Sequence, residues 1–158
     1  MPYFAAMLAR TADGWVGREL DFDEVDDLEA LVELMRDAGE DDEPVLVLVE
    51  EDDEYVAIVR VDGDADPRVF ISDARATEHS AVVALLWDQG GEEVEDDGDE
   101  EAARPEAEPA GDADLLADLG TPSEELLELC AEEGMLPADV IGVTCERAGC
   151  LDVLESLR

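Results

Sequence analysis

The sequence predicts an α+β fold: a five-stranded antiparallel sheet with two helices, in the chain order β-β-α-β-β-β-α, followed by a small C-terminal helical unit. Three observations predict it. Short apolar runs alternate with turn signals over the first half of the chain, six of the seven aromatic residues lie before residue 80, and the composition changes abruptly after residue 87. We therefore divide the 158 residues into a sheet domain (1–87), an acidic linker (88–112) and a helical unit (113–158).

The first two strands are expected to form a hairpin. Residues 3–9 are an apolar run, the pair Asp13–Gly14 follows, and residues 15–20 continue as a second short strand. An Asp-Gly pair between two such runs is typical of a tight turn between antiparallel strands.

An amphipathic helix is expected next, beginning at Asp23 and ending at Gly39. Its apolar residues recur at helical spacing, with acids on the other face. They are Val25, Leu28, Leu31, Val32 and Met35.

Three further strands are expected. Residues 45–50 (VLVLVE) are apolar on both faces, which is typical of a central strand covered on two sides. The acids of 50–54 belong at a hairpin tip because they cannot be buried together, and residues 55–61 and 68–71 form the next strands.

A second helix, capped by Ser72, is expected to run to Trp87. The resulting order of elements is the order of longin-type domains and close to that of roadblock-type domains, which mostly serve as interaction or dimerisation modules. This likeness concerns the order of elements, and a fold does not fix a function.

The linker 88–112 holds twelve acids and one Arg, with Gly, Ala and Pro between them. Such a segment cannot bury enough apolar surface to offset chain entropy, so it is expected to be disordered. Its acids indicate a solubilising tether or, alternatively, a phosphate mimic that occupies a basic surface on a partner.

The helical unit begins with three leucines (Leu115, Leu116, Leu119). Thr121–Glu124 matches a capping box with Pro at the first helical position, and Pro137 opens a second helix that Gly149 ends. Residues 151–157 form a last helical turn or two. A unit of this size is marginal alone and is expected to lean on the sheet domain or on a partner.

The charge balance is extreme, with 47 acidic residues against 9 basic ones, a net charge of −38. A chain this negative is expected to bind neither nucleic acid nor anionic membranes, because both interactions depend on basic residues. No apolar run approaches a membrane span, and three cysteines without a leader peptide indicate reduced thiols. The expected location is the cytoplasm.

Few residues are candidates for reactive chemistry. His79, the single histidine, has no nucleophile motif beside it. Cys130, Cys145 and Cys150 lack the paired short spacings of zinc sites and are expected to be small apolar residues.

A run of alternating aspartates resembles the opening of a calcium loop. However, Pro67 stands where an EF-hand needs Gly, so a solvated turn is favoured. The aspartates are Asp62, Asp64 and Asp66, with Asp73 eleven residues after the first. The chain also lacks the phosphate-binding patterns GxxxxGK[ST] and GxGxxG and the nucleophile pattern GxSxG. We predict no catalytic, cofactor-binding or metal-binding residues and no cofactor.

Four segments carry a family resemblance: MPYFAAMLARTADGWVGRELDFDEVDDLEALVELMRD, DDEPVLVLVEEDDEYVAIVRVDG, DPRVFISDARA and DADLLADLGTPSEELLELCAEEGMLPADVIGVTCERAG. They resemble the tRNA adenosine deaminase-associated proteins of high-GC Gram-positive bacteria, over the whole chain except the acidic linker. The family name reflects gene neighbourhood with the tRNA adenosine deaminase that makes wobble inosine, and the resemblance carries over no functional residues. The chain is not that deaminase, because the zinc motifs HxE and PCxxC are absent and His79 is followed by Ser80 and Ala81.

These observations favour a non-catalytic interaction protein that associates with or regulates a tRNA adenosine deaminase, with charge complementarity as the recruiting force. Two alternatives remain: a homodimeric sheet module whose acidic tether regulates its own surface, and a small metal-dependent enzyme that uses His79 and the cysteines. Light scattering and metal analysis distinguish the three hypotheses.

Overall fold

The structure is a computed structural model that describes residues 4–12, 14–21, 25, 27–39, 43–51, 55–62, 67–72, 110–111, 113–131 and 136–157. The helix expected up to Trp87 and nearly all of the linker 88–112 lie outside these described residues.

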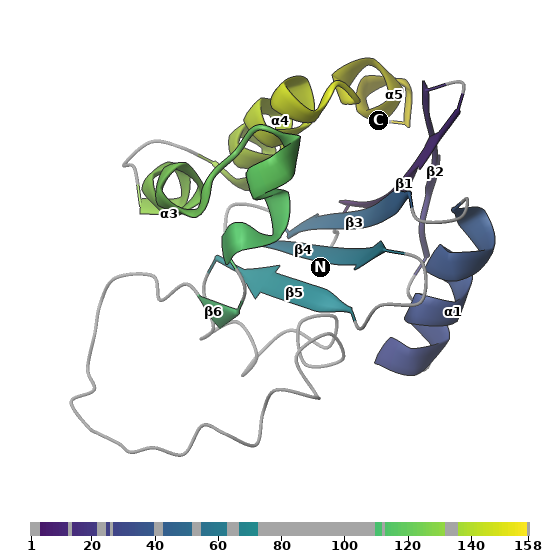
Figure 1. Ribbon diagram of the computed structural model, residues 1–158. Coiled ribbons are helices and arrows are strands. Elements are labelled where there is room, and N and C mark those ends of the chain that lie inside the picture. Colours follow the sequence, from purple (N-terminus) through teal and green to yellow (C-terminus); the bar gives the residue numbers. More distant parts are fainter. Residues whose placement is uncertain are drawn as a thin grey trace.

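The core of the molecule is an antiparallel sheet with the strand order β2-β1-β3-β4-β5-β6 (Figure 1). The five expected strands are all present. A short sixth strand joins the edge beside β5 and comes from the end of the segment expected to be linker. The strands are β1 (Phe4–Thr11), β2 (Gly14–Glu19), β3 (Pro44–Glu51), β4 (Tyr55–Asp62), β5 (Arg68–Ile71) and β6 (Ala110–Gly111).

The β1–β2 hairpin confirms the turn that the Asp-Gly pair predicts. Thr11 pairs with Gly14 across the turn, and Gly14 has a φ of 118°, a conformation that glycine adopts without a steric penalty. The Thr11 hydroxyl donates to the Gly14 carbonyl at 2.8 Å and closes the turn.

The first helix, α1 (Leu28–Ala38), begins later than the sequence predicts. The expected start at Asp23 is wrong, because Val25 is not helical and Asp27 is the N-cap. The Asp27 carboxylate accepts a hydrogen bond from the Ala30 backbone N–H at 2.9 Å, which satisfies one of the unpaired donors of the first turn. Gly39 follows the last helical residue, as expected.

Both faces of the sheet are covered, as the unbroken apolar run of β3 predicts. Side chains of a strand alternate between faces, so Val45, Val47 and Val49 lie on the face that packs against α1. Leu46 and Leu48 lie on the opposite face, in a second core formed with the C-terminal helices.

The C-terminal helices pack on that second face of the sheet (Figure 1). The sequence left open whether the helical unit leans on the sheet domain or on a partner, and the structure shows that it packs on the sheet domain. The helices are the 3₁₀ helix η4 (Ala113–Leu119), α3 (Ser123–Ala131), α4 (Pro137–Ala148) and α5 (Leu151–Leu157). Helix α4 begins at Pro137, as predicted, and ends at Gly149, whose φ of 92° is the left-handed conformation of a helix C-cap.

The capping box expected at Thr121 is wrong. Within the described part of the chain, the Thr121 hydroxyl is buried and has no hydrogen-bond partner, so it does not cap α3. The reason is tertiary: Thr121 is fully buried, and its backbone N–H donates to the Leu116 carbonyl at 3.0 Å, which turns the side chain into the core.

The first hairpin contacts the C-terminal helices where α5 packs against β2. The Trp15 indole N–H donates to the Ala148 carbonyl at 3.2 Å, next to the α4–α5 turn. A Cβ atom at Gly17 would lie 2.5 Å from Leu8 Cδ2 and 2.9 Å from Val153 Cγ1, so the close approach of α5 requires a glycine there.

Ser72 directly follows β5, and its hydroxyl accepts a hydrogen bond from the Val56 N–H at 2.9 Å.

No helix among the described residues is long and apolar enough to cross a membrane.

Candidate functional site

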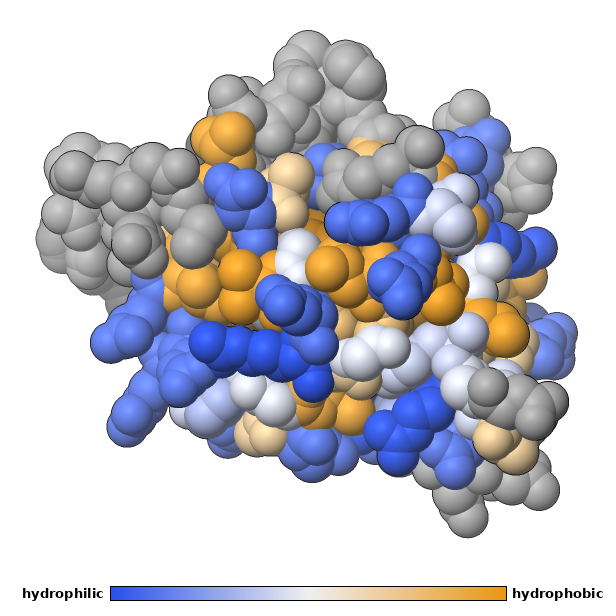
Figure 2. Space-filling model, turned by 90° about the horizontal axis from the view of Figure 1, so that it is seen from above, coloured by the Kyte–Doolittle hydropathy of each residue, from blue (hydrophilic) through white to orange (hydrophobic). Residues whose placement is uncertain are grey.

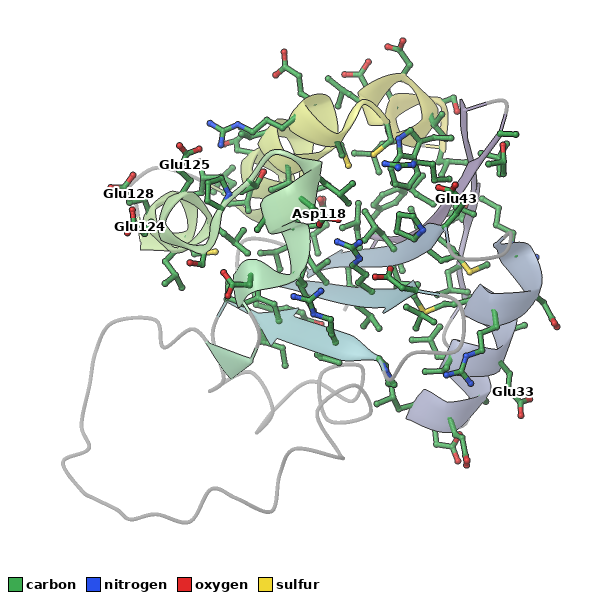
Figure 3. The ribbon with its side chains drawn as sticks, in the orientation of Figure 1. Glu33, Glu43, Asp118, Glu124, Glu125 and Glu128 are labelled. Atoms are coloured by element: carbon green, nitrogen blue, oxygen red, sulfur yellow. The ribbon has the colours of Figure 1, made fainter. Side chains whose placement is uncertain are left out.

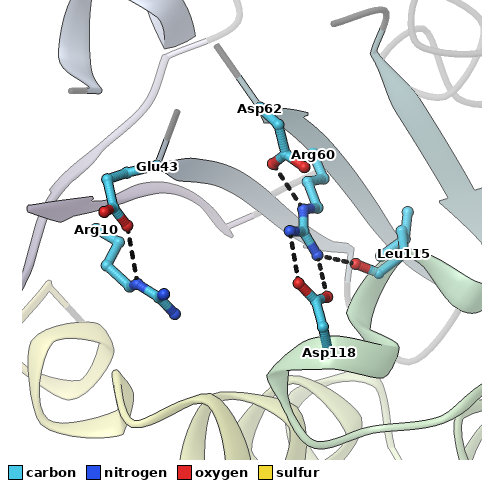
Figure 4. Close-up of polar contacts among 6 residues, drawn as sticks. All are labelled: Arg10, Glu43, Arg60, Asp62, Leu115 and Asp118. Atoms are coloured by element: carbon cyan, nitrogen blue, oxygen red, sulfur yellow. Dashed lines mark hydrogen bonds and ion pairs between the residues drawn. The ribbon is translucent and has the colours of Figure 1, made fainter. Parts of the chain in front are cut away.

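The strongest polar cluster is built around Arg60 on β4 (Figure 4). Arg60 is only 4% exposed and lies on the sheet face covered by the C-terminal helices, opposite Leu46 of β3. Its Nη1 and Nη2 atoms donate to the two carboxylate oxygens of Asp118 at 2.6 and 3.0 Å. Nη1 also donates to the Leu115 carbonyl at 2.6 Å, and Nε donates to Asp62 at 2.8 Å.

This cluster is a structural anchor, because the contacts with Asp118 and Leu115 hold η4 against the sheet. The hydrogen bond with Arg60 lowers the pKa of Asp118, and the paired carboxylates raise the pKa of Arg60. Arg60 is therefore always charged and Asp118 is charged at neutral pH. Neither group is available to exchange a proton with a substrate.

Arg60 was not among the residues that the sequence patterns singled out, although a signal was present. A single Arg inside the apolar strand YVAIVRVD must be paired if it is buried, because an isolated buried charge is very costly. The adjacent partner, Asp62, is visible in the sequence. The second partner, Asp118, is 58 residues away and could not be identified from local pattern.

Of the predicted candidates for chemistry, the structure describes Asp62 and the three cysteines. His79, Asp64, Asp66 and Asp73 lie outside the described residues. Asp62, the first member of the calcium-like run, is engaged by Arg60. Where the structure describes the chain, no group of three or more His, Cys, Asp or Glu side chains is placed to hold a metal ion.

The cysteines are free thiols and pack as apolar residues, as predicted. Burial raises the pKa of Cys130 on α3 to about 12, so this thiol is neutral at physiological pH. Cys145 and Cys150 are buried at the α4–α5 junction, where a hydrogen bond from the Cys145 thiol lowers the pKa of Cys150.

A small hollow lies where α1 meets the first hairpin. Its volume is about 120 Å³, and it is lined by Met7, Ala9, Val16, Gly17, Arg18 and Ala38. This volume is below the roughly 300 Å³ at which small-molecule pockets begin. Arg18 is its one charged lining residue, so the hollow offers no set of convergent polar groups.

Helix α3 presents a different kind of surface. Glu124, Glu125 and Glu128 project outward from it (Figure 3), and Leu127 of the same helix has 39% of its surface exposed. Figure 2, which looks down on α4 and α5, shows apolar side chains in a band across that side of the molecule, flanked by hydrophilic ones. An exposed surface that combines acidic and apolar residues is of the kind that can contact a macromolecule.

A comparison with known proteins identifies the family. The family model described as Rv3753c-like tRNA adenosine deaminase-associated protein matches residues 3–151 of the chain, which confirms the resemblance found in the sequence. No curated protein and no solved structure matches the chain.

Proposed function

Because this chain belongs to the family of Rv3753c-like tRNA adenosine deaminase-associated proteins, we propose that it is a non-catalytic accessory protein that binds a tRNA adenosine deaminase. The single observation that carries the proposal is the family match, whose description names the association. The chain would then act in the cytoplasm, where tRNA is modified.

The non-catalytic role is supported by how the described ionisable groups are used. Arg60 and Asp118 are committed to holding η4 on the sheet, and the Cys130 thiol is neutral. The sequence adds that the deaminase zinc motifs are absent, so adenosine deamination by this chain has no metal-activated water to use.

Binding to a protein, and not directly to tRNA, is supported by the net charge of −38. A phosphate backbone is repelled by this charge, whereas a protein surface that has evolved to hold tRNA is basic and is attracted. Electrostatic complementarity of this kind raises association rates and falls with added salt.

The test is a calorimetric titration of the full chain with the tRNA adenosine deaminase of the same organism. We expect a complex at micromolar protein concentration whose affinity falls as salt is raised, and no inosine formation by the chain alone. Absence of a complex at moderate salt, or deaminase activity of the purified chain, would contradict the proposal.

A second candidate function, self-association, is favoured by the position of β2. In the described sheet β2 pairs only with β1, so its outer edge carries unpaired backbone groups that a second copy could use. Light scattering decides this: a stable monomer across the micromolar range excludes a homodimeric module.

A further inference from the structure

The two cysteines at the α4–α5 junction occupy paired positions of a helix-ending motif. The Cys150 N–H donates to the Cys145 carbonyl at 2.9 Å, and the Gly149 N–H donates to the Glu146 carbonyl at 3.3 Å. With Gly149 in the left-handed conformation, these two bonds form a Schellman motif, and its longer-range bond joins the two cysteines. Side chains at those two positions of the motif commonly pack on each other.

The two thiols are in contact, as the motif predicts. The Cys145 thiol donates a hydrogen bond to the sulfur of Cys150, and both residues belong to the core that the C-terminal helices form with the sheet. Cys145 is 2% exposed and Cys150 is 0% exposed. Because the backbone bond already holds the two residues close, a disulfide between them needs little movement of the backbone.

The third cysteine, Cys130 on α3, is in a different environment. Burial raises the pKa of the Cys130 thiol to about 12, whereas the hydrogen bond from Cys145 lowers the pKa of Cys150. The thiolate is the form that attacks an oxidant, so Cys150 is more reactive than Cys130. A second thiol beside the first makes the reaction reversible, because it converts the first oxidation product into a disulfide.

We propose that Cys145 and Cys150 form a redox-active pair, which a hydroperoxide converts into an intramolecular disulfide and a dithiol reductant restores. The Cys150 thiolate attacks one peroxide oxygen, the O–O bond breaks, and the leaving hydroxide takes up a proton to become water. The Cys145 thiol then attacks the sulfur of the resulting sulfenic acid, and a second water leaves. The two sulfur atoms together lose two electrons, which the peroxide accepts. This chemistry does not depend on the proposed binding to a deaminase.

A small oxidant suits this buried position. Cys150 directly precedes α5, which has seven residues. A helix this short opens locally at a lower free energy than the whole fold, and such opening admits a peroxide to the pair. Between the two cysteines, the Ala148 carbonyl accepts the hydrogen bond from the Trp15 indole at 3.2 Å. Oxidation therefore fixes the turn that the first hairpin contacts.

The test is oxidation of the reduced full chain with hydrogen peroxide, followed by denaturation, alkylation of the remaining thiols and digestion with trypsin. Trypsin cleaves after Arg147, between the two cysteines, so a disulfide joins two peptides that otherwise separate. Mass spectrometry should find the joined peptides, with Cys130 alkylated, and dithiothreitol should separate them. Alkylation of all three thiols, or sulfinic acids in place of the disulfide, would overturn the proposal.

Serine variants identify which cysteines are joined, and thermal unfolding verifies that each variant folds. Cys130→Ser should keep the joined peptides, because the disulfide does not use this residue. Cys145→Ser should lose them and leave a sulfenic acid on Cys150 that dimedone traps. Loss of the joined peptides in Cys130→Ser would show a different pairing and overturn the assignment.

The melting temperature tests whether the folded structure favours the disulfide. If the motif already aligns the two sulfur atoms, the bond forms without strain and restricts the unfolded chain, so oxidation should raise the melting temperature by a few degrees. Cys145→Ser/Cys150→Ser treated with the same peroxide is the control, because it reports any effect of methionine oxidation. A melting temperature that falls on oxidation of the wild-type chain, and not in the control, would show that the junction must distort and would overturn the proposal.

Discussion

At the scale of single residues, the buried hydroxyl of Thr121 offers a sharp test. Thr121→Val keeps the side-chain shape and removes a buried group that has no partner among the described residues. We expect the free energy of unfolding to rise by about 1 kcal/mol, measured by urea denaturation. The control is Thr144→Val, which removes a buried hydroxyl that donates to the Ile141 carbonyl at 2.9 Å and should lower stability. A loss of stability in Thr121→Val would mean that this hydroxyl caps α3 after all.

Asp118 predicts a pH dependence. Its folded-state pKa is lowered by Arg60, so its stabilising effect is present above the unfolded-state pKa and is lost as pH falls through the lower folded-state value. Asp118→Asn should therefore lower the free energy of unfolding at pH 7 by about 1 kcal/mol or less, because the carboxylate is largely solvent-exposed.

The difference in stability between wild type and Asp118→Asn should shrink as the pH falls from the ordinary pKa of an aspartate through the lower folded-state pKa of Asp118, because the carboxylate becomes protonated. Denaturant titrations of both proteins at neutral and acidic pH measure this difference in the free energy of unfolding. Glu155→Gln on the exposed face of α5 makes the same charge change without an anchor and serves as the control. A difference that persists unchanged at acidic pH would contradict the assignment of this ion pair.

At the scale of elements, alanine substitutions at two glycines test the effects of close packing and of helix propensity separately. Gly17→Ala should destabilise the fold by about 1–3 kcal/mol, because the added methyl meets Leu8 and Val153. Gly142→Ala in the middle of α4 meets no atom within 4 Å and should stabilise it by about 1 kcal/mol. Thermal and urea unfolding of both variants measure these changes. Equal effects would show that α5 does not press on β2.

The elements also show what a sequence can and cannot predict. The run VLVLVE predicts a strand covered on both faces, because its alternate residues are apolar on each side, and β3 confirms this. The start of α1 differs from the prediction because Asp23 and Asp27 are equally good N-caps by local chemistry, and tertiary contacts decide between them. Strand β6 consists of Ala and Gly, whose side chains give no pattern.

The location of the polar cluster around Arg60 could not be predicted from the sequence. Composition and motif spacing favour an acidic binding protein, and they do not place Arg60 beside its second partner. Arg60 and Asp118 come together only through the packing of η4 on the sheet, because they lie 58 residues apart in the chain.

At the scale of the whole molecule, the net charge of −38 predicts stabilisation by salt. Repulsion among carboxylates opposes the compact state, and added ions shorten the range of that repulsion to about 8 Å at physiological ionic strength. The melting temperature should rise from low salt to about 0.5 M NaCl and then level off, as measured by circular dichroism. An unchanged or falling melting temperature would show that the carboxylates do not repel strongly in the folded state.

The division of the two cores along the chain has a consequence for synthesis on the ribosome. The face of the sheet formed by Leu46, Leu48, Ile58 and Phe70 is completed by helices that emerge only after residue 113. A nascent chain thus exposes an apolar sheet surface while the remaining residues up to Leu157 are made, on the order of seconds. The intervening sequence 88–112 carries twelve acids, and repulsion between like charges keeps neighbouring nascent chains apart.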